Sequence, residues 1–195
     1  MSQHVSDASN HPTVDTTLMI LVDVQGRLAE LMHDSEAMLR QQGLLIEALN
    51  VLGVPIIWAE QVPDKLGPTN ASLSALLTHQ QAISKVSFGC CEDPNLWQAI
   101  EEQNRQHVIL AGIETHVCVW QTAATLLRAG KTVHVIEDAV SSREQANKVV
   151  GLKRLYQSGA LASSVEMILF ELMGHAKHPH FRTISALIKA ATSHS

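Results

Sequence analysis

The chain has 195 residues, of which 46% are hydrophobic and 17% charged, and its formal net charge is −5. This length can bury a sizeable core, and we expect one domain over residues 16–195 after a flexible N-terminal tail at residues 1–15. The acidic balance supplies no basic surface for nucleic acid or an anionic membrane. No apolar run is long enough to cross a bilayer. The N-terminal residues are polar and lack the pattern of a secretion signal. The odd number of cysteines suits a reducing compartment. We therefore expect a cytoplasmic protein.

Short apolar runs alternate with amphipathic stretches along the chain, which is typical of repeated βα units. The predicted strands are Leu18–Val22, Pro55–Ala59, Ile83–Ser87, Val108–Ala111, Thr132–Ile136 and Ala160–Ser163. The predicted helices are Ala37–Leu52, Asn95–Gln103, His116–Arg128, Arg143–Ser158, Ser164–Gly174 and Phe181–Ala191. Strands joined by crossover helices form a mainly parallel sheet. We predict an α/β fold, a three-layer, doubly wound, six-stranded sheet with helices on both faces.

Three residues in this pattern could carry chemistry. Asp23 ends the first predicted strand, Lys85 lies in the third, and Cys118 stands where the fourth strand gives way to a helix. Right-handed crossovers bring the carboxyl ends of such strands to one edge, where ligands bind. A cysteine at a helix N-terminus faces free N–H groups and the positive end of the helix dipole, so we expect a lowered thiol pKa. Singly, each residue has an ordinary structural interpretation. Together they favour nucleophilic catalysis.

The surrounding segments are Leu21–Gln25, Glu60–Thr69, Ser84–Lys85, Gly112–Val119 and Asp138–Arg143. In order and spacing, from about Thr16 to about Lys189, the chain resembles the isochorismatase-like cysteine hydrolases. The resemblance is strongest to isochorismatase-domain-containing proteins of unassigned substrate. It implies that Asp23, Lys85 and Cys118 form a catalytic triad. It further implies a small-molecule substrate and no cofactor. The apolar excess with so few charges favours a surface that is partly covered by a partner subunit, so we expect a homo-oligomer, either a dimer or a tetramer.

The resemblance also implies a mechanism. The Cys118 thiolate would attack a small amide-like substrate and form a thioester, with Asp23 moving the proton and Lys85 stabilising the anions. Backbone amides of Glu114 and Cys118 would form the oxyanion hole, and relatives suggest a cis peptide between Ile113 and Glu114. The candidates for contacts in the substrate pocket are Gln25, Glu60, Gln61, Phe88, Ile113 and Trp120.

Histidine placement argues against a metal site. Nicotinamidases of this superfamily carry a histidine-containing metal site after the second strand, and Trp58–Thr69 contains no histidine. The cluster of His175, His178 and His180 lacks a matching cysteine or carboxylate set, so we expect a solvated loop there and no metal.

Two other functions remain open from the sequence. One is a catalytically idle interaction or scaffold protein that keeps the fold, and the other is a thiol-redox role. A dinucleotide-binding module is disfavoured, because no G-x-G-x-x-G motif follows the first predicted strand. The identity of the substrate does not follow from the sequence.

Overall fold

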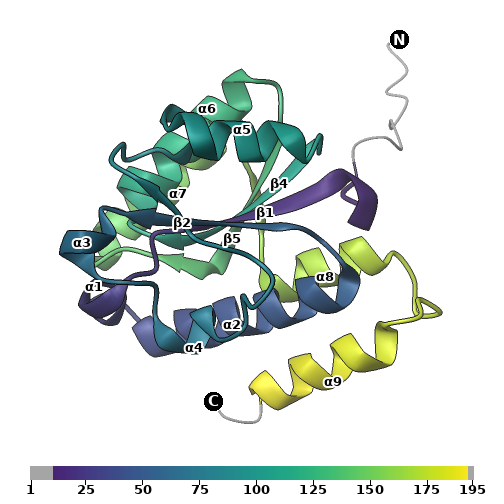
Figure 1. Cartoon of the computed structure of the whole chain (residues 1–195). Coiled ribbons are helices and arrows are strands. Elements are labelled where there is room, and N and C mark those ends of the chain that lie inside the picture. Colours follow the sequence, from purple (N-terminus) through teal and green to yellow (C-terminus); the bar gives the residue numbers. More distant parts are fainter. Residues whose placement is uncertain (1–10, 193–195) are drawn as a thin grey trace.

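A computed structural model describes residues 11–192, in which six parallel strands form one sheet in the order β3-β2-β1-β4-β5-β6 (Figure 1). The strands are β1 (Thr17–Val22), β2 (Ile56–Gln61), β3 (Ile83–Lys85), β4 (His107–Ile113), β5 (Thr132–Ser141) and β6 (Leu161–Ser163). The chain crosses from one half of the sheet to the other between β3 and β4. The carboxyl ends of β1 and β4 therefore lie side by side at the switch point, where open α/β sheets bind ligands.

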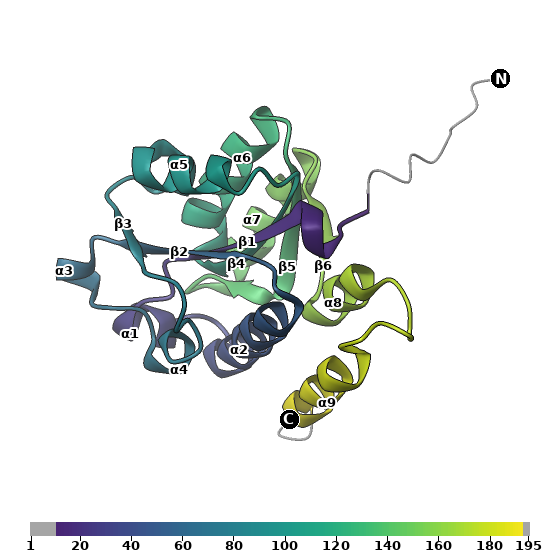
Figure 2. The same ribbon diagram turned by 45° about the vertical axis from the view of Figure 1, so that its right-hand side comes forward.

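Helices cover both faces of the sheet (Figures 1 and 2). Those on one face are α5 (Pro94–Glu102), α6 (Trp120–Arg128) and α7 (Gln145–Gln157). Those on the other are α1 (Gly26–Glu30), α2 (Ser35–Leu52), α4 (Ala71–Ser74), α8 (Val165–Met173) and α9 (Phe181–Thr192), while α3 (Pro63–Leu66) follows β2 at the edge. A π-helical turn, Thr115–Val119, joins β4 to α6. None of the described helices combines the length and apolarity needed to cross a membrane.

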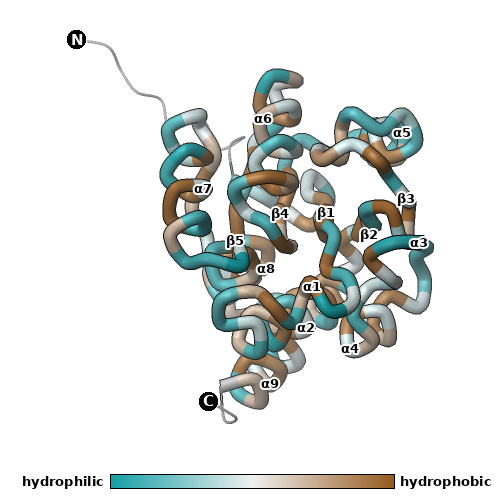
Figure 3. Tube along the Cα trace, turned by 90° about the vertical axis from the view of Figure 1, so that its left-hand side faces the viewer, coloured by the Kyte–Doolittle hydropathy of each residue, from teal (hydrophilic) through white to brown (hydrophobic). Residues whose placement is uncertain are grey.

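The core consists of two apolar clusters separated by the sheet. Alternate residues of β1 serve each side: Met19 and Leu21 pack toward α2 and α8, whereas Leu18 and Ile20 pack toward α5 and α6. All six residues of β1 are buried, which explains why this strand appears in the sequence as one continuous apolar run. Viewed with α1 and α3 toward the reader (Figure 3), the brown central strands lie enclosed by helices.

The predicted fold class is confirmed, and the structure adds local features that periodicity missed. Strand β5 continues beyond its predicted end to Ser141, after a register irregularity opposite Leu110 and Gly112. The stretch after β2, predicted to be irregular, contains the short helices α3 and α4. Most of the predicted tail, residues 1–10, lies outside the described residues. Residues 11–15 are not a loose tail, because Pro12 is buried and Arg105 Nη1 donates a 2.9 Å hydrogen bond to the Val14 carbonyl.

Candidate active site

The site begins where β1 and β4 end next to each other. Asp23 directly follows β1, is buried, and has a left-handed φ of 56°. Gly112 on β4 pairs with Val22 and has a φ of 142°. A Cβ atom on Gly112 would clash with the backbone of Val22. Glycine therefore permits the close approach that places Asp23 beside the turn leaving β4.

Lys85 is a buried cation whose hydrogen-bonding capacity is fully used. Its Nζ donates to Asp23 Oδ2 at 2.7 Å and to Gln61 Oε1 at 2.7 Å. It also donates to the carbonyls of Ser87 at 3.1 Å and Phe88 at 2.9 Å. The side chains of Lys85 and Asp23 are 0% and 4% exposed. Four acceptors occupy an ammonium group that has three protons, so Lys85 fixes its neighbours and has no donor to spare for a ligand.

Cys118 lies on the π-helical turn after β4. The turn is entered through Glu114, which has a left-handed φ of 54°. Thr122 Oγ1 donates to the Cys118 carbonyl at 2.8 Å, and helix α7 packs on the outside of the turn at Gly151. A Cβ atom on Gly151 would lie 2.9 Å from His116 Cα, so this glycine allows α7 to brace the turn. Single π turns inside helices are frequent at functional sites.

Asp23 and Cys118 are electrostatically coupled. Burial raises the pKa of Asp23, and Lys85 opposes that shift, as does the neighbouring Cys118 thiol. The other carboxylate oxygen, Asp23 Oδ1, is buried without a hydrogen-bond partner among the described side chains. One oxygen is thus fixed by Lys85, and the other is free to accept a proton.

The expectation of a lowered thiol pKa at Cys118 is wrong for the resting protein. Burial raises the pKa of Cys118, and the Asp23 carboxylate raises it further, whereas Lys85 lowers it less. The helix dipole is outweighed because the thiol is desolvated next to an anion. Cys118 therefore rests as a thiol beside a base.

A cavity of about 410 Å³ opens onto this pair. Its lining is mainly apolar and consists of Asp23, Leu28, Gln61, Leu66, Phe88, Ile113, Glu114, Val117, Cys118 and Arg143. Gln61, Phe88 and Ile113 are predicted pocket residues that lie in this lining. Leu66 comes from the segment after β2, so this segment does form one wall of the cavity.

The other three predicted pocket residues have structural contacts instead. The Gln25 amide bonds to both backbone groups of Gln61, at 2.6 and 3.1 Å, and so ties the chain after β1 to β2. Glu60 accepts hydrogen bonds from the backbone and hydroxyl of Thr69. Trp120 faces Arg154, whose guanidinium carbon lies 4.3 Å from the ring centroid. None of the three lines the cavity.

Sequence reasoning did not select Arg143, which lies at the cavity rim on the segment after β5. Its Nε donates to Glu114 Oε1 at 2.6 Å, and the Arg143 side chain is 60% exposed. Glu114 Oε2 lies 3.3 Å from His116 Nδ1, which is itself 3.0 Å from Ser142 Oγ. A signal was available, because Arg143 ends the motif Asp138–Arg143. The predicted strand ended at Ile136, however, so the sequence did not place Arg143 near the carboxyl end of a strand. In the structure β5 extends to Ser141.

The predicted cis peptide between Ile113 and Glu114 is wrong. All peptide bonds among the described residues are trans. The change of direction after β4 is instead produced by the backbone angles of Gly112 and Glu114, both with positive φ. The oxyanion role of the Glu114 and Cys118 amides stays a proposal.

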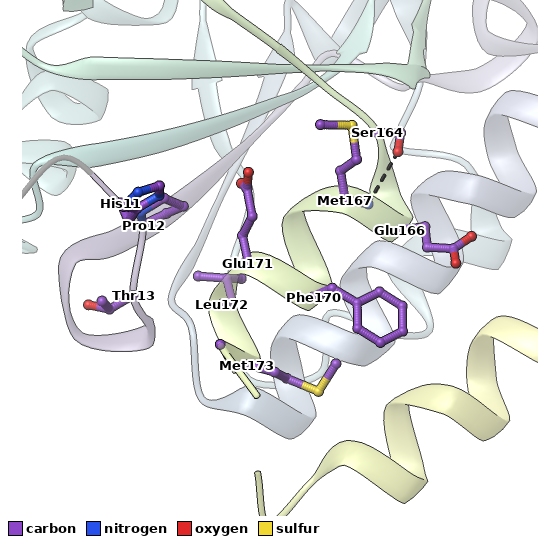
Figure 4. Close-up of a pocket in the computed structure, with 11 residues that line it drawn as sticks. His11, Pro12, Thr13, Ser164, Glu166, Met167, Phe170, Glu171, Leu172 and Met173 are labelled. Atoms are coloured by element: carbon purple, nitrogen blue, oxygen red, sulfur yellow. Dashed lines mark hydrogen bonds between the residues drawn. The ribbon is translucent and has the colours of Figure 1, made fainter. Parts of the chain in front are cut away.

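A second cavity, of about 1040 Å³, is formed by residues 11–13 and helix α8 (Figure 4). Met167 and Phe170 are exposed there, and Ser164 caps α8 by accepting a hydrogen bond from the Met167 amide. This cavity contains no cysteine, and no residue of the proposed triad lines it. Within residues 11–192, no cluster of three or more histidine, cysteine or acidic side chains is arranged to hold a metal ion, the three histidines at 175, 178 and 180 included.

Comparison with known proteins identifies the family. The isochorismatase domain model matches residues 17–167. The chain belongs to the isochorismatase domain family. It is 35% identical over 175 residues to isochorismatase domain-containing protein 2 of Bos taurus, covering 89% of this chain and 83% of that protein.

Two solved structures share the fold of this chain. A Caenorhabditis elegans protein described as MAR1 ribonuclease is 33% identical, with a TM-score of 0.87 and 92% coverage of both chains. The Escherichia coli YcaC gene product, described as an octameric hydrolase of unknown specificity, is 18% identical, with a TM-score of 0.84 and 100% coverage of both chains. At that identity the second comparison supports the fold alone.

Proposed function

We propose that this isochorismatase-family protein is a cysteine-dependent hydrolase that cleaves the C–N bond of a small amide-like substrate. The observation that carries the proposal is that the two carboxylate oxygens of Asp23 have different hydrogen-bonding environments. Its Oδ2 is held by Lys85 at 2.7 Å, whereas its buried Oδ1 has no hydrogen-bond partner among the described residues and its charge raises the pKa of the neighbouring Cys118 thiol. This arrangement suits a general base beside a nucleophile.

In the first half of the reaction, Asp23 Oδ1 takes the Cys118 proton as Sγ bonds to the carbonyl carbon. The resulting oxyanion would accept hydrogen bonds from the backbone N–H groups of Glu114 and Cys118. Protonated Asp23 then gives its proton to the leaving nitrogen, the C–N bond breaks, and an amine and a thioester remain. Burial raises the pKa of the Asp23 carboxyl above its usual range, which makes it a stronger base toward the thiol proton.

In the second half, Asp23 takes a proton from water, whose oxygen attacks the thioester carbon. The C–S bond breaks, the carboxylic acid leaves, and Asp23 returns its proton to the Cys118 thiolate. Lys85 keeps Asp23 in position throughout and does not need to touch the substrate, because protein acceptors already occupy its ammonium group.

The cavity supports a small and partly apolar substrate. Its volume of about 410 Å³ lies at the lower end of the usual range for ligand sites, and Leu28, Leu66 and Val117 contribute apolar surface. We expect the amide to point inward to Cys118 and any larger group to lie against Phe88 at the mouth.

The test is a screen of small amides for release of ammonia or amine. Activity lost in Cys118→Ala and Asp23→Asn but kept in Cys91→Ser, a control at a half-buried thiol, supports the proposal. RNA is included in the screen because the Caenorhabditis elegans relative is described as a ribonuclease. Cleavage of RNA that persists in Cys118→Ala would overturn the thioester mechanism, and complete inactivity with a Cys118 that no electrophile modifies would favour the idle scaffold.

We also propose that the chain forms a homo-oligomer. The Escherichia coli relative is described as octameric, and several large apolar side chains of this chain are exposed. They are Leu31, Val86, Phe88, Val149, Val150, Leu161, Met167 and Phe170. Surface of this kind is typical of subunit contacts. Sedimentation at micromolar concentration should give a species heavier than the 21.3 kDa monomer, and a monomer at all concentrations would refute this.

A further inference from the structure

We propose that Arg143 is a specificity-determining residue that selects amides carrying a carboxylate at the end remote from the scissile bond. This rests on the proposed hydrolase function and names its substrate class. Arg143 is the single cationic side chain among the described residues that line the Cys118 cavity. The anion it would recognise is part of the substrate itself.

Gln61 is the other described lining residue whose side chain carries N–H donors, and both ends of its amide are already engaged. Gln61 accepts from Lys85 through Oε1 and donates to the Val86 carbonyl at 2.7 Å through Nε2. Lys85 is bonded to four acceptors below the cavity floor. A ligand that needs a charged hydrogen-bond donor therefore finds one at Arg143. No other described side chain in the lining supplies one.

Arg143 is oriented for recognition by its partner. Its Nε donates to Glu114 Oε1 at 2.6 Å, and Glu114 is 10% exposed and lies 3.3 Å from His116. The two terminal nitrogens of the guanidinium make no hydrogen bond to any other described residue, and the side chain is 60% exposed. A guanidinium held at Nε still offers a planar pair of N–H donors, which matches the two oxygens of a carboxylate.

The charge distribution gives the substrate a direction. A carboxylate placed deep in the cavity would approach Asp23, and like charges at short distance are unfavourable. A carboxylate at the rim would pair with Arg143 and leave the neutral amide facing Cys118. Each charge belongs to an ion pair, but the deep pair presents the unpartnered oxygen of Asp23 to the cavity and the rim pair presents the terminal N–H donors of Arg143, which favours one orientation of a substrate that is neutral at one end and anionic at the other.

The experiment uses two alkylating reagents with the same electrophile. Iodoacetylglycine ends in a carboxylate, and iodoacetylglycinamide ends in a neutral carboxamide of nearly the same size. The rate of Cys118 alkylation by each is read by peptide mass spectrometry and divided by the rate with glutathione in the same solution. In the wild-type protein we expect the normalised ratio to favour the carboxylate reagent by roughly fivefold to tenfold and to fall with added salt.

Variants then assign the preference to Arg143. Arg143→Gln should abolish it, Arg143→Lys should keep part of it as a point charge, and Lys153→Gln, which removes an exposed cation of α7 outside the cavity, should keep all of it. General damage to the site would slow both reagents equally and leave the ratio unchanged.

The two proposals fail in different ways. Equal rates with both reagents in the wild-type protein, or a preference that survives in Arg143→Gln, would overturn the Arg143 proposal and leave the hydrolase proposal intact. A Cys118 that neither reagent modifies would overturn the proposed function and this inference with it. The salt dependence of the wild-type protein is informative even where Arg143→Gln folds poorly.

Discussion

Two ion pairs at the same cavity differ in depth and in what they leave available. The Asp23–Lys85 pair is buried, with side chains 4% and 0% exposed, whereas the Arg143 side chain of the Glu114–Arg143 pair is 60% exposed. In the deep pair, described residues accept hydrogen bonds from every N–H donor of Lys85, and the atom without a described partner is the acceptor Asp23 Oδ1. In the rim pair, the groups without a described partner are N–H donors of Arg143. Lys85 can therefore hold a base in position, whereas Arg143 can bind an anion.

The difference also predicts unequal energetic roles. Removing one member of a buried pair leaves an uncompensated charge in a desolvated environment, while an exposed partner can be replaced by water. The deep pair should therefore dominate turnover and stability, and the rim pair should act on selectivity. Four predictions test this contrast, beginning with the largest expected effect.

Cys118→Ala and Asp23→Asn should each lower turnover by roughly a thousandfold or more, because they remove the nucleophile and its base. Steady-state kinetics on an amide found by the screen measure this, with circular dichroism to confirm the fold. Their effects should not multiply in the double variant, since both residues serve one proton transfer. A double variant as slow as the product of the two single effects would argue against a shared step.

Lys85→Met should lower the free energy of unfolding by about 3 to 5 kcal/mol, because Asp23 would remain buried without its cation. Arg143→Gln is the matched change in the rim pair and should cost about 1 kcal/mol or less. Urea denaturation at neutral pH compares the two. If both variants lose the same stability, the distinction between a positioning pair and a recognition pair is wrong.

A further pair of side chains is buried at the amino ends of the strands, where His107 Nδ1 and His134 Nε2 are 3.0 Å apart. Burial lowers the pKa of both, that of His134 to about 4. Since the folded pKa lies below the unfolded one, the stabilising contribution is complete above about pH 6.5 and is lost as the pH falls toward 4.

The wild-type protein should thus lose about 1 to 2 kcal/mol more than His134→Gln between pH 7 and pH 5. Urea unfolding of both proteins across that interval isolates the histidine from the carboxyl groups that titrate in parallel. Parallel curves would show that His134 is not held neutral by burial.

The smallest effect concerns the thiol itself. Asp23 raises the pKa of Cys118, so Asp23→Asn should increase alkylation of Cys118 by iodoacetamide about threefold to tenfold at pH 8, while turnover falls. The rate in the wild-type protein should keep rising with pH past 9. Slower alkylation in Asp23→Asn would mean that the carboxylate activates the resting thiol and does not suppress it.

Much of the fold could be predicted from the sequence because its signals are local. The apolar run of β1 and the amphipathic period of α2 fix their own element types, and Asp93-Pro94 marks the start of α5 with a side-chain cap and a proline at the first position. The positions of Asp23, Lys85 and Cys118 relative to strand ends follow from the same pattern. Parallel topology then brings them to one edge.

Other features depend on contacts between distant residues. Trp120 follows Cys118 closely in sequence, yet the π-helical turn directs it toward Arg154 and away from the cavity. The raised pKa of the Cys118 thiol comes from its burial and from the neighbouring Asp23 carboxylate, neither of which a helix-terminus argument contains.

The sequence by itself determined the α/β fold, the order of its strands along the chain and the residue types available for thiol chemistry. These follow from periodicity and short motifs, which depend only on residues close together in the sequence. Only the tertiary structure decided which polar groups are satisfied. Within residues 11–192, Lys85 donates to four acceptors, Asp23 Oδ1 has no hydrogen-bond partner, and Arg143 pairs with Glu114 across 29 positions of the chain. Burial and hydrogen-bond satisfaction are properties of the packed chain, so the distinction between a base and a recognition group appears only there.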